Sequence, residues 1–155
     1  NEIQLAIKPH PFLKSILAQN SLWGDERTEE YFNYWDELDN CQYVEGDYKE
    51  LFKQSDALIH DSGSFMTEYL VLNKPIAYTV NEKPIKNRFN EFGEIVLSGH
   101  QLIYSKCDLR NFIEDLISGV DPLTKEREKI IFEQNLNNLE LISEKIITEI
   151  NNKLT

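Results

Sequence analysis

Blocks of apolar residues with two different spacings alternate along the chain. Short, nearly continuous apolar runs predict strands at residues 3–7, 41–44, 57–59, 75–80 and 101–104. Apolar positions at helical spacing predict helices at residues 12–18, 28–38, 65–72, 92–97 and 108–117, another starting at Tyr48, and a long C-terminal helix over 124–152. Such alternation with short connections favours an α/β fold, a Rossmann-like parallel sheet with helices on both faces. The polar stretch 81–90 is predicted to be a surface loop.

The length of 155 residues fits a single domain able to bury a core, so we expect residues 1–155 to form one Rossmann-like domain. The sequence opens without a methionine, directly on a predicted core strand. We therefore expect a fragment of a larger two-domain enzyme. Apolar runs are too short to span a bilayer and no secretory signal precedes them, which predicts a cytoplasmic protein.

Acidic side chains outnumber basic ones, and the formal net charge is −11. This excess argues against broad electrostatic binding of nucleic acid or of an anionic membrane surface, so any phosphate recognition has to be local. The two cysteines, Cys41 and Cys107, are too few and too far apart for a disulfide framework or a zinc site. We therefore expect no metal and a reducing compartment.

The first candidate site is Lys8-Pro9-His10-Pro11, which follows the first predicted strand. Two prolines restrict the backbone around His10, so its imidazole is held in a reproducible direction. A histidine donates a hydrogen bond to a phosphate in either protonation state, and Lys8 supplies a supporting cation. The alternative is a turn histidine and a surface lysine without a role in binding.

The second candidate site is Asp61-Ser62-Gly63-Ser64, between a predicted buried strand and a predicted helix. Its small residues let backbone N–H groups approach phosphate oxygens, and the two serine hydroxyls add donors. Glu68 follows one helical turn later, where a carboxylate can accept hydrogen bonds from a ribose diol. The alternatives are serines that only cap the helix and a solvated glutamate.

The other two histidines are interpreted differently. His60 ends a buried run, and its ring is as compatible with the core as with a ligand. His100, in Ser98-Gly99-His100, is predicted to be a loop residue outside the site.

These motifs, together with residues 48–52 and 55–60, Tyr69 and Lys74-Pro75-Ile76, resemble the carboxyl-terminal half of the CDP-glycerol glycerophosphotransferase family, the teichoic-acid and capsule polymerases. The resemblance covers residues 3–80 well and the remainder by general layout. It implies one half of a GT-B transferase, in which two Rossmann-like domains face a cleft and the carboxyl-terminal domain binds the nucleotide. It further implies that His10, Ser62, Gly63 and Ser64 contact donor phosphates, with His10 catalytic, Glu68 on the ribose, and Lys8 and Asp61 supporting.

The implied partners are a nucleotide-diphosphate donor, most simply CDP-linked, and an acceptor polymer or lipid-linked glycan bound through the missing N-terminal half. No further cofactor is implied, and the parent enzyme is expected at the inner face of the membrane without direct membrane contact from this domain. The family often has Thr-Asp-Tyr-Ser-Ser where this chain has Gly63 between its serines. The turn is also similar to the Asp-Ser-Gly-Gly turn of UDP-N-acetylglucosamine 2-epimerases. A sugar-nucleotide epimerase, a glycosyltransferase and a stand-alone nucleotide-binding or interaction module therefore stay open as alternatives.

Overall fold

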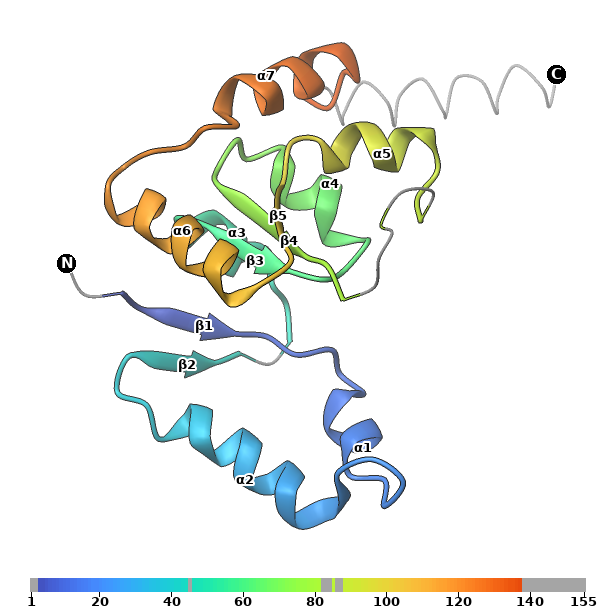
Figure 1. The fold of residues 1–155 in the computed structure, drawn as a ribbon, viewed down its shortest axis with the longest axis vertical. Coiled ribbons are helices and arrows are strands. Elements are labelled where there is room, and N and C mark those ends of the chain that lie inside the picture. Colours follow the sequence, from blue (N-terminus) through green and yellow to red (C-terminus); the bar gives the residue numbers. More distant parts are fainter. Residues whose placement is uncertain (1–2, 45, 82–84, 86–87, 138–155) are drawn as a thin grey trace, which may run out of the picture. The chain divides into compact units, whose positions relative to one another are not determined.

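A computed structural model describes residues 3–44, 46–81, 85 and 88–137 of the chain. The chain divides into two compact units, Asn1–Leu51 and Phe52–Thr155. Figure 1 shows the order of their elements, and each unit is described by itself.

Unit 1 is a single strand–helix–helix–strand crossover. Its elements are β1 (Leu5–Ile7), α1 (Leu13–Leu17), α2 (Gly24–Asp36) and β2 (Cys41–Tyr43). The two strands pair in parallel, with Leu5 opposite Cys41 and Ile7 opposite Tyr43. A parallel pair requires a crossover, which the two helices provide.

The core of unit 1 is small. Phe32 of α2 is buried and meets the Tyr43 ring edge to face, with the centroids 5.9 Å apart. Lys14 of α1 pairs with Glu29 of α2 at 2.8 Å, and both side chains are about half exposed. Strand β1 is itself well exposed, and Leu5 keeps 42% of its surface accessible. Unit 1 therefore rests on a few aromatic contacts and on solvated polar ones.

Unit 2 is built on a three-stranded parallel sheet in the order β3-β4-β5. Helix α3 (Lys49–Gln54) leads into it across the boundary between the units. The remaining elements are β3 (Leu58–His60), α4 (Phe65–Leu70), β4 (Ile76–Thr79), α5 (Glu91–Leu97), β5 (Gln101–Ile103), α6 (Lys106–Ile117) and α7 (Thr124–Glu133).

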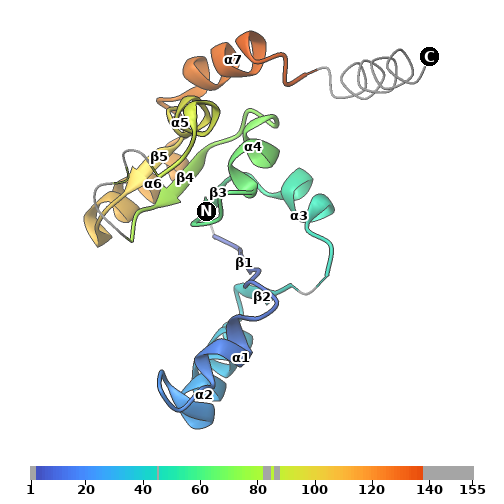
Figure 2. The same ribbon diagram turned by 90° about the vertical axis from the view of Figure 1, so that its right-hand side faces the viewer.

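The central strand β4 supplies side chains to two core layers. Tyr78 packs with α4, α5 and α7 in a cluster that includes Leu70, Val96 and Ile130. Ala77, its neighbour in the strand, packs with Phe112 of α6 on the other side. Successive strand residues point to opposite faces, so a strand covered on both sides reads as a continuous apolar run. Helices α4 and α6 accordingly lie on opposite sides of this sheet (Figure 2).

Helix α6 has specific signals at both ends. The Ser105 hydroxyl accepts a hydrogen bond from the Asp108 amide at 3.3 Å and donates one to the Asp108 carboxylate at 2.9 Å. At the other end Gly119 has a φ of +69°, and the Val120 amide donates to the Asp115 carbonyl. This is a Schellman motif, which satisfies the last free carbonyls of the helix.

Helix α7 ends earlier than the predicted helix 124–152. Asn135 takes a φ of +54°, its amide donates to the Phe132 carbonyl, and the Leu136 amide donates to the Ile131 carbonyl. Leu136 then turns inward and is buried. These bonds form a second Schellman motif, closed by asparagine instead of glycine. The prediction of a helix through residues 134–137 was therefore wrong, and residues 138–152 lie outside the described part of the chain.

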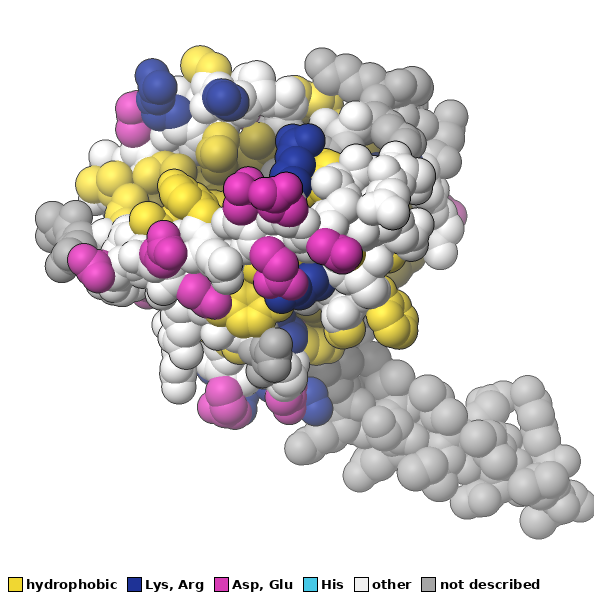
Figure 3. Space-filling model, turned by 90° about the horizontal axis from the view of Figure 1, so that it is seen from below, with side chains coloured by type: hydrophobic (Ala, Val, Ile, Leu, Met, Phe, Trp, Pro, Cys, Tyr) yellow, Lys and Arg dark blue, Asp and Glu magenta, His cyan; other side chains and the backbone are white. Residues whose placement is uncertain are grey.

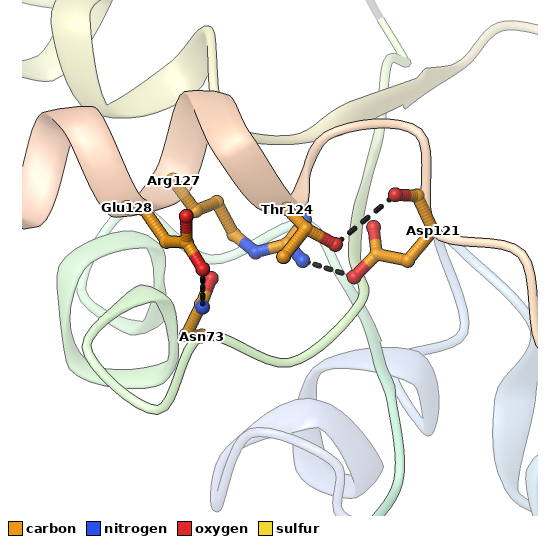
Figure 4. Close-up of polar contacts among 5 residues, drawn as sticks. All are labelled: Asn73, Asp121, Thr124, Arg127 and Glu128. Carbon is orange, nitrogen blue, oxygen red and sulfur yellow. Dashed lines mark hydrogen bonds and ion pairs between the residues drawn. The ribbon is translucent and has the colours of Figure 1, made fainter.

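Polar contacts attach α7 to the rest of unit 2 (Figure 4). The Arg127 guanidinium is buried and forms an ion pair with Asp121, whose carbonyl accepts a hydrogen bond from the Thr124 hydroxyl at 3.0 Å. Asn73, just after α4, donates to Glu128 at 3.3 Å. Close packing adds to this, because a Cβ on Gly99 would approach Leu70 to 2.9 Å and Arg127 to 3.0 Å. The side of the sheet that carries α4 and α5 is thereby closed by α7.

The predicted α/β class, with parallel strands alternating with helices, is confirmed. The observed boundaries differ from the predicted ones by a few residues, most at α2, which begins at Gly24 and not at Thr28. Much of the predicted loop 81–90 lies outside the described residues. In the described part of the chain, no helix combines the length and the apolar character that crossing a membrane requires.

Candidate functional site

The turn of residues 61–64 connects strand β3 to helix α4, at the carboxyl end of the strand. The Ser62 and Ser64 hydroxyls lie 2.9 Å apart, within hydrogen-bond distance of each other. Gly63 therefore does not separate the two hydroxyls. Since one hydroxyl donates to the other, the second keeps its own proton for an external acceptor.

The Ser64 side chain is not used to cap α4. Ser64 occupies the N-cap position, but its side chain makes no capping hydrogen bond. Residues Asp61, Gly63 and Ser64 are exposed, whereas Ser62 is partly buried. The structure therefore does not support the alternative in which Ser64 has only a capping role.

Core side chains hold three consecutive carbonyls of this segment. The Thr79 hydroxyl donates to the His60 carbonyl at 3.3 Å, the Tyr78 hydroxyl to the Asp61 carbonyl at 3.1 Å, and the His60 ring to the Ser62 carbonyl at 3.0 Å. In a planar trans peptide the C=O and the following N–H point in opposite directions. Because the carbonyls point to the core, the amides of residues 61–63 point away from it. Amides whose carbonyls are held in this way, together with the serine hydroxyls, are donors of the kind that bind an anion.

Lys74 and Tyr69, which follow the 61–64 turn in the sequence, support the chain around it. The Lys74 ammonium donates to the Lys53 carbonyl at 2.6 Å and to the Ser55 carbonyl at 2.7 Å, at the end of α3. The buried Tyr69 hydroxyl lies 3.0 Å from the Ser55 hydroxyl. Glu68 is exposed in the first turn of α4. Lys74 and Tyr69 are thus structural residues, and Glu68 alone of this group has the exposure that a ligand contact requires.

The turn of residues 8–11 follows β1 in unit 1. The Phe12 amide donates to Nδ1 of His10 at 3.2 Å. An Nδ1 that accepts a hydrogen bond places the proton of a neutral imidazole on Nε2. His10 is exposed, so the structure leaves an Nε2–H donor facing solvent. Lys8, two residues earlier, is partly buried.

The structure thus brings Asp61, Ser62, Gly63 and Ser64 into one turn, with Glu68 on the helix that follows. Lys8 and His10 belong to the other unit, in a turn of their own. On the face seen in Figure 3, basic side chains are dispersed among acidic and apolar ones and form no broad positive area. Among the described residues, no group of three or more His, Cys, Asp or Glu side chains is placed to hold a metal ion.

Sequence analysis missed the environment of His100. This residue does lie in a loop, between α5 and β5, but it is only 3% exposed and its ring centroid is 5.4 Å from that of the buried His60. Burial lowers the pKa of His60 from 6.5 to about 4. Burial, together with the neighbouring His60, also lowers the pKa of His100 to about 4. Both rings are therefore neutral at neutral pH. Only the apolar stretch 95–97 before His100 could have indicated its burial from the sequence.

Comparison with known proteins identifies one family. Residues 1–86, more than half of the chain, match the model of the CDP-Glycerol:Poly(glycerophosphate) glycerophosphotransferase family. No curated protein matches the chain, and neither does any solved structure. The match includes both the 8–11 turn and the 61–64 turn, on which the resemblance rested. The chain belongs to the CDP-glycerol:poly(glycerophosphate) glycerophosphotransferase family.

Proposed function

We propose that this chain binds the CDP-linked donor of a glycerophosphotransferase through the 61–64 turn. The observation that carries the proposal is the geometry of that turn, with two paired serine hydroxyls and a backbone whose carbonyls are held by core side chains. Phosphate oxygens accept hydrogen bonds only, so a surface made of N–H and O–H donors matches them. The match to a family named for a CDP-glycerol donor supports this choice of ligand.

Each candidate residue has a role in this proposal. The 61–64 turn binds the diphosphate, and Glu68 accepts hydrogen bonds from the ribose diol. His10 donates its Nε2–H to a donor phosphate, the role that the family resemblance implies for it. Lys8 and Asp61 support the two turns. His10 is the proposed catalytic residue, because its donor would contact the phosphate that leaves with the nucleotide.

The chemistry proposed is transfer of glycerophosphate. An acceptor hydroxyl attacks the phosphorus that carries glycerol, a new P–O bond forms to the acceptor, and the bond to the bridging oxygen breaks to release CMP. Negative charge grows on the departing CMP phosphate. Hydrogen-bond donors fixed before the reaction stabilise that charge without reorganising, and they also position the donor.

We also propose the wider setting that the resemblance implies. The acceptor is a cell-surface polymer such as teichoic acid or a capsule chain, bound by a second Rossmann-like domain in a GT-B arrangement, and that domain supplies the general base. The 155-residue chain alone would then bind nucleotide weakly and transfer nothing. Transfer of glycerophosphate by this chain alone, from CDP-glycerol to an acceptor polymer, would contradict this division of roles.

Calorimetric titration with CDP, UDP, CMP and inorganic phosphate tests the binding proposal. We expect CDP to bind more tightly than CMP, because the turn is proposed to hold a diphosphate, and inorganic phosphate to bind most weakly. Equal affinity for CDP and inorganic phosphate would indicate a site that selects any anion. Absence of CDP binding at millimolar concentration would overturn the proposal.

A further inference from the structure

Two buried histidines pack behind the 61–64 turn. His60 ends β3 and is 8% exposed, and His100 precedes β5 and is 3% exposed. Tyr78 meets the His60 ring edge to face at 5.3 Å, and its hydroxyl donates to the Asp61 carbonyl. The ring of His60 is therefore enclosed by aromatic neighbours directly beneath the turn.

The hydrogen bonds fix the tautomer of both rings. Nδ1 of His60 lies 3.0 Å from the Ser62 carbonyl, and Nδ1 of His100 lies 2.9 Å from the Val96 carbonyl. A carbonyl oxygen only accepts hydrogen bonds, so Nδ1 is the donor in each neutral ring. Both Nε2 atoms then carry lone pairs, and both are buried without a hydrogen-bond partner among the described residues.

A buried polar atom without a partner destabilises the folded state, so a histidine at position 60 has a cost that an apolar residue would avoid. The Nδ1–H bond to Ser62 is what an apolar residue could not supply. That bond restrains the Ser62–Gly63 peptide, which would otherwise rotate easily because glycine has few conformational restrictions. Holding the Ser62 carbonyl against the core keeps the Gly63 amide directed outward.

We propose that His60 is a positioning residue, whose Nδ1–H fixes the Ser62–Gly63 peptide so that the 61–64 turn presents its donors to the phosphates of the nucleotide. The inference rests on the proposed function for its ligand, but it concerns a residue that touches no substrate. His100 packs against the His60 ring, with the two ring centroids 5.4 Å apart.

Two substitutions separate positioning from packing. His60→Leu keeps an apolar filler and removes the donor, while His60→Asn keeps an N–H donor near the place of Nδ1. We expect His60→Leu to raise the dissociation constant of CDP about tenfold, with no loss of thermal stability, because the unpaired Nε2 is removed as well. We expect His60→Asn to stay within about threefold of the unsubstituted chain. Equal affinity of a folded His60→Leu chain, or equal weakening by both substitutions, would overturn the inference.

NMR of the chain without nucleotide gives a second measurement. The ¹⁵N chemical shifts of the His60 ring should show a protonated Nδ1 and an unprotonated Nε2 at pH 7. The Gly63 amide should give one sharp signal that broadens in His60→Leu and stays sharp in His60→Asn. A proton on Nε2 of His60 would contradict the inference even if CDP binds, and lack of CDP binding with the expected ring shifts would contradict only the proposed function.

Discussion

The two candidate turns, residues 8–11 and residues 61–64, are supported in different ways. Side chains of β4 and β3 anchor the 61–64 turn, through Tyr78, Thr79 and His60. The 8–11 turn is held by bonds within its own neighbourhood, where the Phe12 amide donates to the His10 ring and the Leu13 amide to the His10 carbonyl. Strand β3, before the 61–64 turn, ends in the buried His60, whereas β1, before the 8–11 turn, ends in the partly buried Ile7.

This difference shows which of the two turns is fixed by a core before any ligand binds. A turn anchored to a core stabilises charge without reorganising, and a turn anchored only to itself has to be ordered by the ligand. If both turns bind phosphate as proposed, residues 61–64 should supply most of the affinity and His10 an adjustable contact. The predictions below test the contrast between a densely packed unit 2 and a lightly packed unit 1.

The largest effect is expected from the ion pair of unit 2, between the buried Arg127 and the partly buried Asp121. Asp121→Ala leaves the Arg127 guanidinium buried without a counter-ion, which should cost about 3–5 kcal/mol of unfolding free energy. The control is Glu29→Gln, which breaks the exposed Lys14–Glu29 pair of unit 1 and should leave stability unchanged. Urea denaturation followed by circular dichroism measures both. Equal losses in the two variants would contradict the contrast.

A second prediction concerns acid. The pKa of His60 and of His100 is lowered by burial to about 4, so below pH 6.5 the unfolded chain binds protons that the folded chain does not. Stability should therefore fall as pH drops from 6.5 to 4, by roughly 3 kcal/mol for a single histidine. Asp61 partly offsets the lowering of the His60 pKa, whereas Arg127 lowers the pKa of His100 further.

The test of this pH dependence is a series of urea titrations between pH 7 and pH 4. In His60→Leu the decline in stability should be shallower than in the unsubstituted chain, since one buried histidine is gone. The two contributions are not additive, because the rings contact each other. Parallel curves for the two proteins would contradict the prediction.

Substitution of the proposed phosphate contacts should have an intermediate effect. Ser64→Ala and His10→Ala should each weaken CDP binding by about 1–3 kcal/mol, as expected for a lost hydrogen bond to a charged oxygen, with the larger loss in Ser64→Ala. Ser118→Ala is the control, because Ser118 is an exposed serine at the end of α6. Calorimetry measures all three variants, and unchanged affinity in both site variants would remove these residues from the site.

The smallest effect is expected from single hydrogen bonds behind each turn. Tyr78→Phe leaves the Asp61 carbonyl without its side-chain partner and should cost about 1 kcal/mol of unfolding free energy. Ser15→Ala removes an exposed bond to the Phe12 carbonyl and should change stability by less. Thermal unfolding ranks the two variants. A larger loss in Ser15→Ala would mean that the 8–11 turn is the more firmly supported one.

Much of this structure could be predicted from the sequence because its signals are local. Apolar spacing gave the strands and helices, and small residues between β3 and α4 indicated the 61–64 turn. The end of α7 was missed because Asn135 adopts a positive φ only as part of a Schellman motif, which periodicity does not reveal.

Long-range contacts account for the other omissions. Tyr78 and Thr79 each donate to a carbonyl of the 60–61 segment, and Lys74 contacts three carbonyls at the end of α3. Each of these contacts joins residues 17–22 positions apart. The packing of His60 on His100 joins residues still further apart. Such pairs are set by the tertiary fold, so a single sequence does not disclose them.

The most direct test of donor binding at the 61–64 turn is an NMR titration of the 155-residue chain with CDP. The largest amide shifts should fall on Ser62, Gly63 and Ser64, with smaller shifts at His10. Shifts confined to other residues, or no shifts at saturating CDP, would contradict donor binding at this turn.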